Sequence, residues 1–172
     1  QYPPGSTFKT SQAVTFLTEG IINDSTRFPC HGGFSFKGLH VGCHGHPSPL
    51  SVVPALSTSC NGFFCWGLYY MMGNRRKYPN VQVAMNTWRD YMKSMGFGYK
   101  LGIDLPGEKR GLIPNAEFYD KAYRGSWNGL TIISISIGQG EVNLTPLQIA
   151  NLGATIANRG YYYAPHVVRK VK

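Results

Sequence analysis

The sequence has few acidic residues and few cysteines. Only 8 acidic residues stand against 17 basic ones over 172 positions, which gives a formal net charge of +9. The basic residues form short groups, at 75–77, 109–110 and 169–172, without the dense clustering or stacking motif of a nucleic-acid binder. We therefore expect no nucleic-acid partner. Four cysteines are too sparse for a disulfide scaffold in a chain of this length, so they do not fix the compartment.

A long hydrophobic run is also missing. The longest strongly apolar stretch, Phe63–Met72, is about half of what a helix needs to cross a bilayer, and we expect no membrane span here. The start, Gln1-Tyr-Pro-Pro-Gly, has no initiating Met, basic segment or apolar segment, so we expect no signal peptide and a chain that begins inside a longer protein. With 42% apolar residues, the chain can still bury the core of one domain.

Hydrophobic periodicity and capping residues predict a mainly helical chain with few strands. We expect helices over residues 6–17, 49–56, 62–72, 81–95 and 146–158, with one or two helical turns at 117–123. Residues 26–48 predict an irregular loop with a short β-hairpin, and 102–114 an exposed loop. The alternation of Ile133, Ile135 and Ile137 predicts a half-buried strand over 131–137, and a last strand begins at 161 and runs to 171.

Two short motifs carry groups that suit acyl transfer. Ser6 and Lys9 form an S-x-x-K pattern at a predicted helix start, where residues three apart share one face and the amine can take the proton of the hydroxyl. Ser59-Cys60-Asn61 forms an S-x-N pattern in the polar break between two apolar helices, where a turn can point both polar side chains into one cleft. The alternatives are ordinary helix caps at both places and a solvated lysine. A second S-x-N, at 126–128, lies in a loop and is attributed to chance.

Longer runs add specificity to these motifs. They are, in chain order, Tyr2-Pro-Pro-Gly-Ser-Thr-Phe-Lys, Ser59-Cys-Asn-Gly-Phe-Phe, Gly102-Ile-Asp-Leu-Pro-Gly-Glu, and Ile135-Ser-Ile-Gly-Gln-Gly-Glu leading into Thr145-Pro-Leu-Gln-Ile-Ala. Together they resemble the transpeptidase domain of class B penicillin-binding proteins of the penicillin-binding protein 2 type. The resemblance implies the helical part of the α/β fold shared with serine β-lactamases, with an incomplete sheet.

The resemblance also implies a mechanism. Ser6 would attack the penultimate D-alanine carbonyl of a peptidoglycan stem peptide, Lys9 would take its proton, Ser59 would relay it, and β-lactams would acylate the same serine. Asn61 would hold a substrate amide. Gly138, Gln139 and Gly140 would line the cleft opposite, unless they are an ordinary glycine-rich turn.

The setting follows from the same resemblance. Catalysis would need no cofactor. The partners would be stem peptides, β-lactam antibiotics and a glycosyltransferase of the cell-elongation machinery. The protein would work on the periplasmic face of a bacterial inner membrane, held by an N-terminal anchor outside this chain.

One family motif is missing from the sequence. A K-[ST]-G motif on a strand grips the substrate carboxylate in this family, and its nearest match here, Lys109-Arg110-Gly111, lies in a predicted loop and lacks the hydroxyl. We therefore expect residues 1–172 to form a partial transpeptidase domain with little or no activity alone. The alternatives are a serine β-lactamase or β-lactam sensor, and a non-catalytic module that binds the cell wall through the basic surface.

Metal-ligating residues crowd into the loop predicted at 26–48. Six of them fall within 17 positions, namely Cys30, His31, His40, Cys43, His44 and His46. Thiolate and imidazole ligands suit zinc, and we expect Cys30, Cys43, His44 and His46 to hold a structural ion. A disulfide between Cys30 and Cys43 is one alternative, and free thiols with solvated imidazoles are the other.

Overall fold

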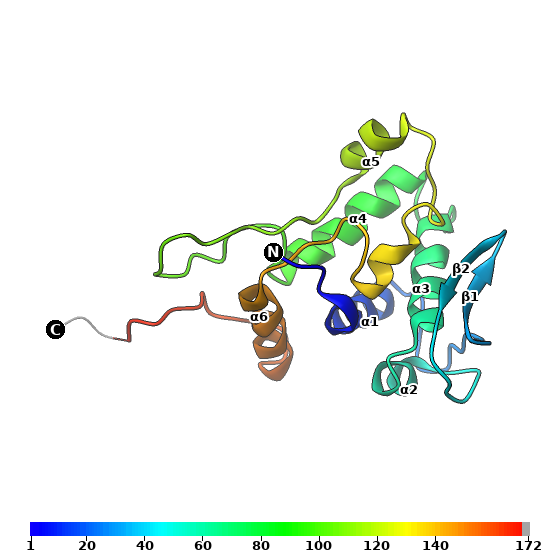
Figure 1. Cartoon of the computed structure of the whole chain (residues 1–172), viewed down its shortest axis with the longest axis horizontal. Helices are drawn as coiled ribbons and strands as arrows, with labels where there is room; N and C mark the ends of the chain where they lie inside the picture. Colours follow the sequence, from blue (N-terminus) through cyan, green and yellow to red (C-terminus); the bar gives the residue numbers. More distant parts are fainter. Residues whose placement is uncertain (170–172) are drawn as a thin grey trace.

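The computed structural model describes residues 1–169, and these are mainly helical, as predicted (Figure 1). The strands β1 (Gly33–Phe36) and β2 (Leu39–Gly42) form an antiparallel hairpin in which Phe34 lies opposite Val41. The helical elements, of which η1 and η2 are 3₁₀ helices, are η1 (Gly5–Phe8), α1 (Lys9–Thr18), α2 (Val52–Ser57), α3 (Asn61–Gly73), α4 (Val81–Ser94), α5 (Ala116–Tyr123), η2 (Ile133–Ile137) and α6 (Pro146–Ala157).

Helix α3 is the centre of the core. It is apolar on all sides, which is typical of a helix buried all round, and it packs against β1, η2, α1 and α4 (Figure 1). At Gly67 the ring of Phe16 from α1 fills the place of a side chain, because a Cβ built there would lie 2.5 Å from that ring. This close contact fixes α1 beside α3, and therefore the S-x-x-K segment beside the S-x-N turn.

Side-chain caps set the start of the later helices where the sequence predicts them. The side chain of Asn80 accepts a hydrogen bond from the N–H of Val83 at the start of α4. At the start of α6, Thr145 and Gln148 form a reciprocal capping box, followed by Pro146 at the first helical position. The predictions for 81–95 and 146–158 are confirmed within a residue at each end.

The strand predicted over 131–137 is wrong, since this segment contains the 3₁₀ helix η2. Burial follows a period of three instead of two: Ile132 and Ile133, then Ile135 and Ser136, then Gly138 are buried, and the residues between them are more exposed. A 3₁₀ helix has three residues per turn, so this pattern fits it. The segment packs on helix α3 and has no neighbouring strand within residues 1–169 that would satisfy a strand's backbone groups.

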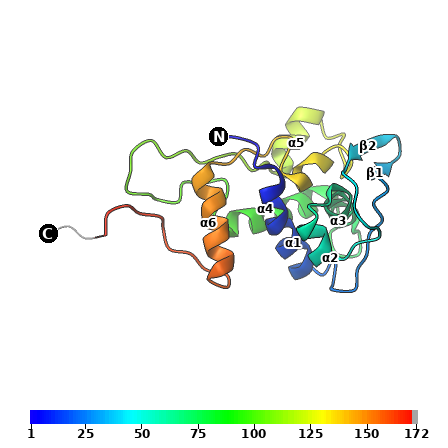
Figure 2. The same ribbon diagram turned by 60° about the horizontal axis from the view of Figure 1, so that its bottom comes forward.

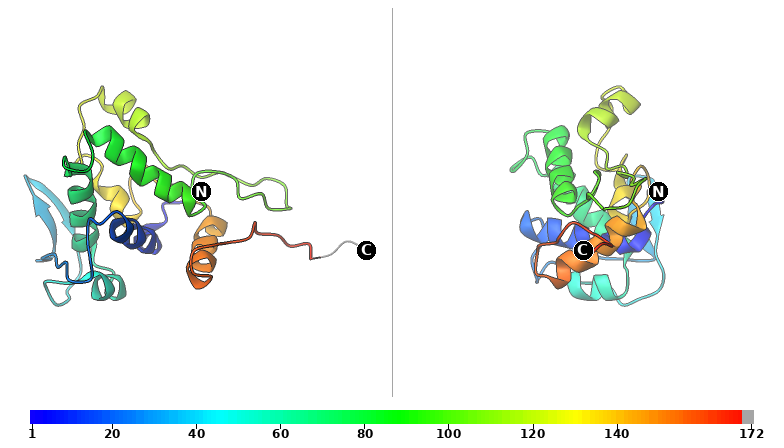
Figure 3. Two further views of the ribbon diagram at one scale, coloured as in Figure 1. Left: turned by 180° about the vertical axis from the view of Figure 1, so that it is seen from behind. Right: turned by 90° about the vertical axis from the view of Figure 1, so that its left-hand side faces the viewer.

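The strand predicted from 161 to 171 is also not observed over residues 161–169, and its last two positions lie outside the described residues. The backbone N–H groups of Val167 and Val168 donate to the carboxylate of Asp104. This segment and the loop between α4 and α5 project beyond α6 on the side away from α3 (Figures 2 and 3). Among residues 1–169, no helix combines the length and apolar character that crossing a membrane requires.

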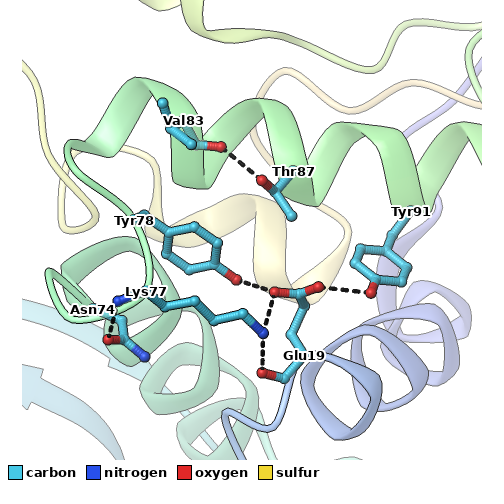
Figure 4. A network of polar contacts seen from close by, with 7 residues as sticks. All are labelled: Glu19, Asn74, Lys77, Tyr78, Val83, Thr87 and Tyr91. Atoms are coloured by element: carbon cyan, nitrogen blue, oxygen red, sulfur yellow. Dashed lines mark hydrogen bonds and ion pairs between the residues drawn. The ribbon is translucent and has the colours of Figure 1, made fainter.

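Glu19, directly after α1, ties the end of this helix to two other parts of the chain (Figure 4). Its carboxylate lies 2.6 Å from Lys77 Nζ and accepts hydrogen bonds from the hydroxyls of Tyr78 and of Tyr91, which belongs to α4. Partial burial would raise the pKa of Glu19, but the hydrogen bonds from Lys77 and both tyrosines outweigh it and lower the pKa below 4.5. Glu19 is therefore a fully compensated charge.

Candidate active site

Lys9, the first residue of α1, is the centre of a cluster of polar groups. The side chain is buried, and its Nζ lies 3.1 Å from Ser6 Oγ, 2.9 Å from Ser59 Oγ, 2.6 Å from the Ser59 carbonyl oxygen and 2.6 Å from Asn61 Oδ1. The two sequence motifs, 50 residues apart, therefore meet at one nitrogen atom.

The acceptors around Lys9 determine which proton it can take. The Ser59 carbonyl and Asn61 Oδ1 only accept hydrogen bonds, so they hold two N–H groups of the amine. The orientation of the Asn61 amide is fixed, because its Nδ2 donates to the carbonyl of Gly42 at 2.8 Å. In the neutral amine the lone pair is then left for the hydroxyls of Ser6 and Ser59, which are able to donate.

Burial lowers the pKa of Lys9 below its ordinary 10.5, although the thiols of Cys43, Cys60 and Cys65 oppose this by raising it. Within residues 1–169 no carboxylate forms an ion pair with Lys9. A buried ammonium without a counter-charge loses hydration that its neutral neighbours replace only in part, so the neutral amine becomes easier to form. A lysine in this state is suited to act as a general base.

Ser6 is exposed and lies in η1, the 3₁₀ turn that continues into α1. The alternative that Ser6 is an ordinary helix cap is wrong: the N-cap of η1 is Pro4 and that of α1 is Phe8, and neither position has a side-chain cap. The hydroxyl of Ser6 is thereby free of backbone capping and is available both to Lys9 and to a substrate.

The turn between α2 and α3 brings the side chains of Ser59 and Asn61 to Lys9, as predicted from the break in the sequence. Ser59 has a φ of +54°, a left-handed conformation that costs a non-glycine residue about 1 kcal/mol. Cys60 is the N-cap of α3, where its Sγ accepts a hydrogen bond from the N–H of Phe63 at 3.3 Å. The strain at Ser59 is therefore part of what aims the S-x-N motif at the amine.

Gly138 packs directly against the segment that carries the nucleophile. The N–H of Gly5 donates to the Gly138 carbonyl at 2.9 Å, and a Cβ built on Gly138 would lie 2.2 Å from the Gly5 carbonyl oxygen. Gln139 and Gly140 follow on the exposed side of this contact. The structure thus places Gly138 and Gln139 next to the start of the S-x-x-K segment, with Gly138 filling a position that admits no side chain. The atoms nearest to a Cβ built on Gly140 belong instead to Ser134 and Ile135.

A cluster of thiols and one imidazole lies next to the S-x-N turn and includes Cys60 of that turn. The ligand atoms of Cys30, Cys43, His46 and Cys60 all lie within 4.8 Å of one another. His44, expected in this set from the sequence, is outside it; its Nδ1 lies 3.9 Å from Cys43 Sγ. Cys60 takes its place. Because Cys60 lies outside residues 30–46, nothing in the local sequence indicates it as a ligand.

The donor set fits zinc. In a tetrahedral site with Zn–S bonds of about 2.3 Å, neighbouring sulfur atoms are roughly 3.8 Å apart, so this cluster needs only a small contraction. Burial would raise the pKa of the Cys43 thiol, but hydrogen bonds from the Asn61 N–H, His46, the Gly62 N–H and Cys30 outweigh it and lower the pKa to about 7. The cysteines among residues 1–169 are free thiols.

The cluster and the lysine site share one residue. The backbone N–H of Asn61 donates to Cys43 Sγ at 3.3 Å, while the Asn61 side chain contacts Lys9. A movement of Cys43 in the thiol cluster can therefore reach Lys9 through a single residue, Asn61.

Several known proteins are similar to this chain over nearly its whole length. A peptidoglycan D,D-transpeptidase MrdA from Acinetobacter baumannii is 34% identical over 98% of this chain, and the match covers 24% of that relative. The crystal structure of Pseudomonas aeruginosa PBP2 in complex with WCK 5153 matches 98% of this chain and 37% of its own, with 26% identity and a TM-score of 0.78. A third match is a structure of a peptidoglycan synthase complex, whose description is the structural coordination of polymerization and crosslinking. It matches 98% of this chain and 27% of its own, with 29% identity and a TM-score of 0.82.

The chain thus spans about a quarter of the length of the curated relatives it matches. The family model described as the penicillin binding protein transpeptidase domain matches residues 1–172. This match, together with the meeting of S-x-x-K and S-x-N at Lys9, shows that the chain belongs to the penicillin-binding protein transpeptidase domain family.

Proposed function

We propose that this chain is the part of a peptidoglycan D,D-transpeptidase that carries its nucleophile, Ser6, and its general base, Lys9. The observation that carries the proposal is the position of Lys9 Nζ between the hydroxyls of Ser6 and Ser59, with two acceptor-only oxygens opposite. The substrate class is the D-alanyl-D-alanine end of peptidoglycan stem peptides, and the third, K-[ST]-G motif lies elsewhere in the longer protein.

The first half of the reaction forms the acyl-enzyme. Neutral Lys9 takes the proton of Ser6, and Oγ attacks the carbonyl of the penultimate D-alanine. The tetrahedral intermediate then expels the last D-alanine, whose amine receives a proton through Ser59. The Ser59 hydroxyl lies 2.9 Å from Lys9 Nζ, so one short transfer connects the base to the leaving group.

The second half transfers the acyl group to the amine of a neighbouring stem peptide, with Lys9 again taking a proton. Asn61 holds Lys9 through Oδ1, and we propose that a substrate amide competes with the Gly42 carbonyl for Asn61 Nδ2. Gly138, Gln139 and Gly140 form the opposite side of the cleft next to Ser6. Catalysis needs no cofactor.

Labelling of the full-length protein with a fluorescent penicillin tests this function. We expect one adduct, located on Ser6 by peptide mass spectrometry and absent in Ser6→Ala. Ser59→Ala should slow labelling strongly, whereas Ser126→Ala, in the second S-x-N sequence, should leave the rate unchanged because Ser126 lies exposed in a loop. An adduct on another serine, or none on the full-length protein, would overturn the proposal. Strong stoichiometric labelling of residues 1–172 alone would overturn their status as an inactive part.

Two other functions separate in the same assay. A β-lactamase would release the penicilloyl group within seconds to minutes, whereas a transpeptidase keeps it. A non-catalytic cell-wall module would bind peptidoglycan without any adduct. The lysine cluster favours the transpeptidase over the module, since a binding module has no need of a buried, uncompensated amine at a hydroxyl.

We infer the partners and the location of the longer protein from the family to which the chain belongs. The synthase-complex structure that this chain resembles couples polymerization to crosslinking, and we propose a glycosyltransferase of the cell-elongation machinery as the partner of the longer protein. β-Lactam antibiotics are expected to bind at Ser6. We propose the periplasmic face of a bacterial inner membrane as the location, with the anchor in another part of the protein.

We further propose that Cys30, Cys43, His46 and Cys60 hold a structural zinc ion, which would brace the hairpin against the S-x-N turn. Elemental analysis of the purified protein should find one zinc per chain. His46→Ala should lose the ion, and His44→Ala, the matched control, should retain it. Equal retention of zinc in both variants would contradict this ligand set.

A further inference from the structure

The three thiols of the cluster differ in how accessible they are. Cys30 is 5% exposed and Cys60 is fully buried, whereas Cys43 is half-buried. His46 Nε2 lies 3.4 Å from Cys43 Sγ. In metal-free protein, Cys43 is therefore the thiol that an oxidant in solution reaches first.

The hairpin holds Cys30 and Cys43 near each other. The N–H of Cys43 donates to the carbonyl of Gly32 at 2.8 Å and extends the β1–β2 pairing by one position beyond the Gly33–Gly42 pair. Cys30 lies two residues before Gly32 in the chain, on the segment that leads into β1. The loop that a bond between them closes is short and already folded, and the two sulfur atoms lie within the 4.8 Å span of the cluster.

Cys60 is bound differently. Its sulfur accepts the N–H of Phe63 and caps α3, so a bond from Cys60 to either neighbour would disturb the first turn of the central helix. Cys30 does not cap a helix, since it lies in the loop before β1 and packs against Gly62.

We propose that Cys43 is an oxidation site, and that a peroxide-class oxidant converts Cys43 and Cys30 of the metal-free protein into a reversible disulfide that displaces Asn61. In the first step the Cys43 thiolate takes one oxygen of hydrogen peroxide and becomes a sulfenic acid, and hydroxide leaves. In the second step the Cys30 sulfur attacks this sulfur and water leaves. Two thiols lose two hydrogens, and one hydrogen peroxide becomes two waters.

The new bond acts on the active site through two contacts. It draws Cys43 Sγ toward Cys30 and turns it into a disulfide sulfur, which is a weaker acceptor for the Asn61 N–H that it contacts at 3.3 Å. The adjacent Gly42, whose carbonyl receives Asn61 Nδ2 at 2.8 Å, moves with it. Asn61 Oδ1 holds Lys9, so the oxidised protein should acylate Ser6 between about 10- and 100-fold more slowly. This consequence rests on the proposed transpeptidase function, whereas the disulfide itself does not.

The test treats the full-length protein, stripped of metal by a chelator, with hydrogen peroxide. We expect a mass loss of two hydrogens, a linked peptide pair that contains Cys30 and Cys43, and reversal by a thiol reductant. Cys43→Ala should abolish the link, and Cys65→Ala, outside the cluster, should leave it unchanged. A link between Cys43 and Cys60, or only irreversible oxygen addition to Cys43 in the wild type, would overturn the proposal.

Penicillin labelling before oxidation, after it, and after re-reduction tests the effect on the active site. The rate should fall in the disulfide form and recover with the reductant. A disulfide that forms without changing the rate would overturn the coupling to Asn61. Reduced protein that is never labelled would instead contradict the proposed function, so the two failures can be told apart.

Discussion

The two ends of helix α1 carry opposite charges in opposite electrostatic surroundings. At the C-terminal end, Glu19 is 11% exposed and is met by the ammonium of Lys77 and two tyrosine hydroxyls (Figure 4). At the N-terminal end, Lys9 is 2% exposed, and within residues 1–169 all its hydrogen-bond partners are neutral oxygens. One charge is compensated and the other is not, on a single helix.

Because of this difference, Glu19 contributes to the stability of the fold and Lys9 is suited to proton transfer. A compensated carboxylate keeps its charge and ties α1 to the segment before α4 and to α4 itself, which stabilises the fold. An uncompensated ammonium is costly to bury, and this cost makes its proton easier to lose. The helix therefore holds a fixed ion at one end and a potential base at the other.

The largest expected effect comes from removing the uncompensated lysine. Lys9→Met in the full-length protein should slow Ser6 acylation by about 10²–10⁴, the range for loss of a general base. Lys77→Met removes the ammonium that pairs with Glu19 at the other end of α1. It should lower the free energy of unfolding by about 1 kcal/mol without changing the acylation rate. Stopped-flow labelling and thermal melts measure the two quantities, and equal loss of acylation in both variants would refute the distinction.

The pH dependence of acylation sharpens the same comparison. Because burial lowers the pKa of Lys9 below 10.5, the fraction of neutral amine rises with pH and reaches its plateau earlier than for a free lysine. The acylation rate constant should rise about tenfold per pH unit below that pKa and then level off. A rate that is flat across this range in wild-type protein would argue for a different base.

The contact between Gly138 and Gly5, the residue before Ser6, can be broken by adding a side chain at Gly138. Gly138→Ala should cost about 3 kcal/mol or more, because φ is +69° and the new Cβ would meet the Gly5 carbonyl at 2.2 Å. Gly140→Ala is the matched control: φ is +68°, but the nearest atom lies at 3.6 Å, so only the backbone cost of about 1 kcal/mol remains. Chemical denaturation measures both, and similar losses would show that the Gly5 contact is unimportant.

A small effect is expected at Glu19, the compensated end of α1. Glu19→Gln should lower the free energy of unfolding at neutral pH by about 1–2 kcal/mol, because the ionised acceptor is lost. The folded-state pKa of Glu19 lies below its ordinary 4.5, so its contribution is complete above about pH 4.5 and disappears as pH falls through the folded pKa. Wild-type stability should therefore approach that of the variant in acid, and a constant gap between them from pH 7 to pH 2 would contradict this role.

The sequence predicts the side chains that meet at Lys9 better than it predicts the secondary-structure elements around them. Ser6, Lys9, Ser59 and Asn61 could be named because their spacing and the polar break between α2 and α3 constrain where they point. The segment 131–137 could not be assigned correctly, because alternating isoleucines suit a strand equally well and only the packing on α3 selects a 3₁₀ helix.

Two other residues show what local patterns leave out. Cys60 joins the thiol cluster from a position 14 residues beyond His46, and only the fold brings it there. Glu19 did carry a signal: an acidic residue at the C-terminal end of a helix opposes the helix dipole, which indicates a compensating partner elsewhere. The identity of that partner depends on tertiary packing.

A measurement of the pKa of Lys9 tests most directly whether Lys9 can act as the base for Ser6. Carbon-13 NMR of the lysine Cε in the labelled protein, with the Lys9 signal assigned by its absence in Lys9→Met, gives the titration midpoint. We predict a midpoint clearly below 10.5, caused by burial without a counter-charge. A midpoint at or above 10.5 would mean that Lys9 stays an ammonium under working conditions, and would contradict its role as the base for Ser6.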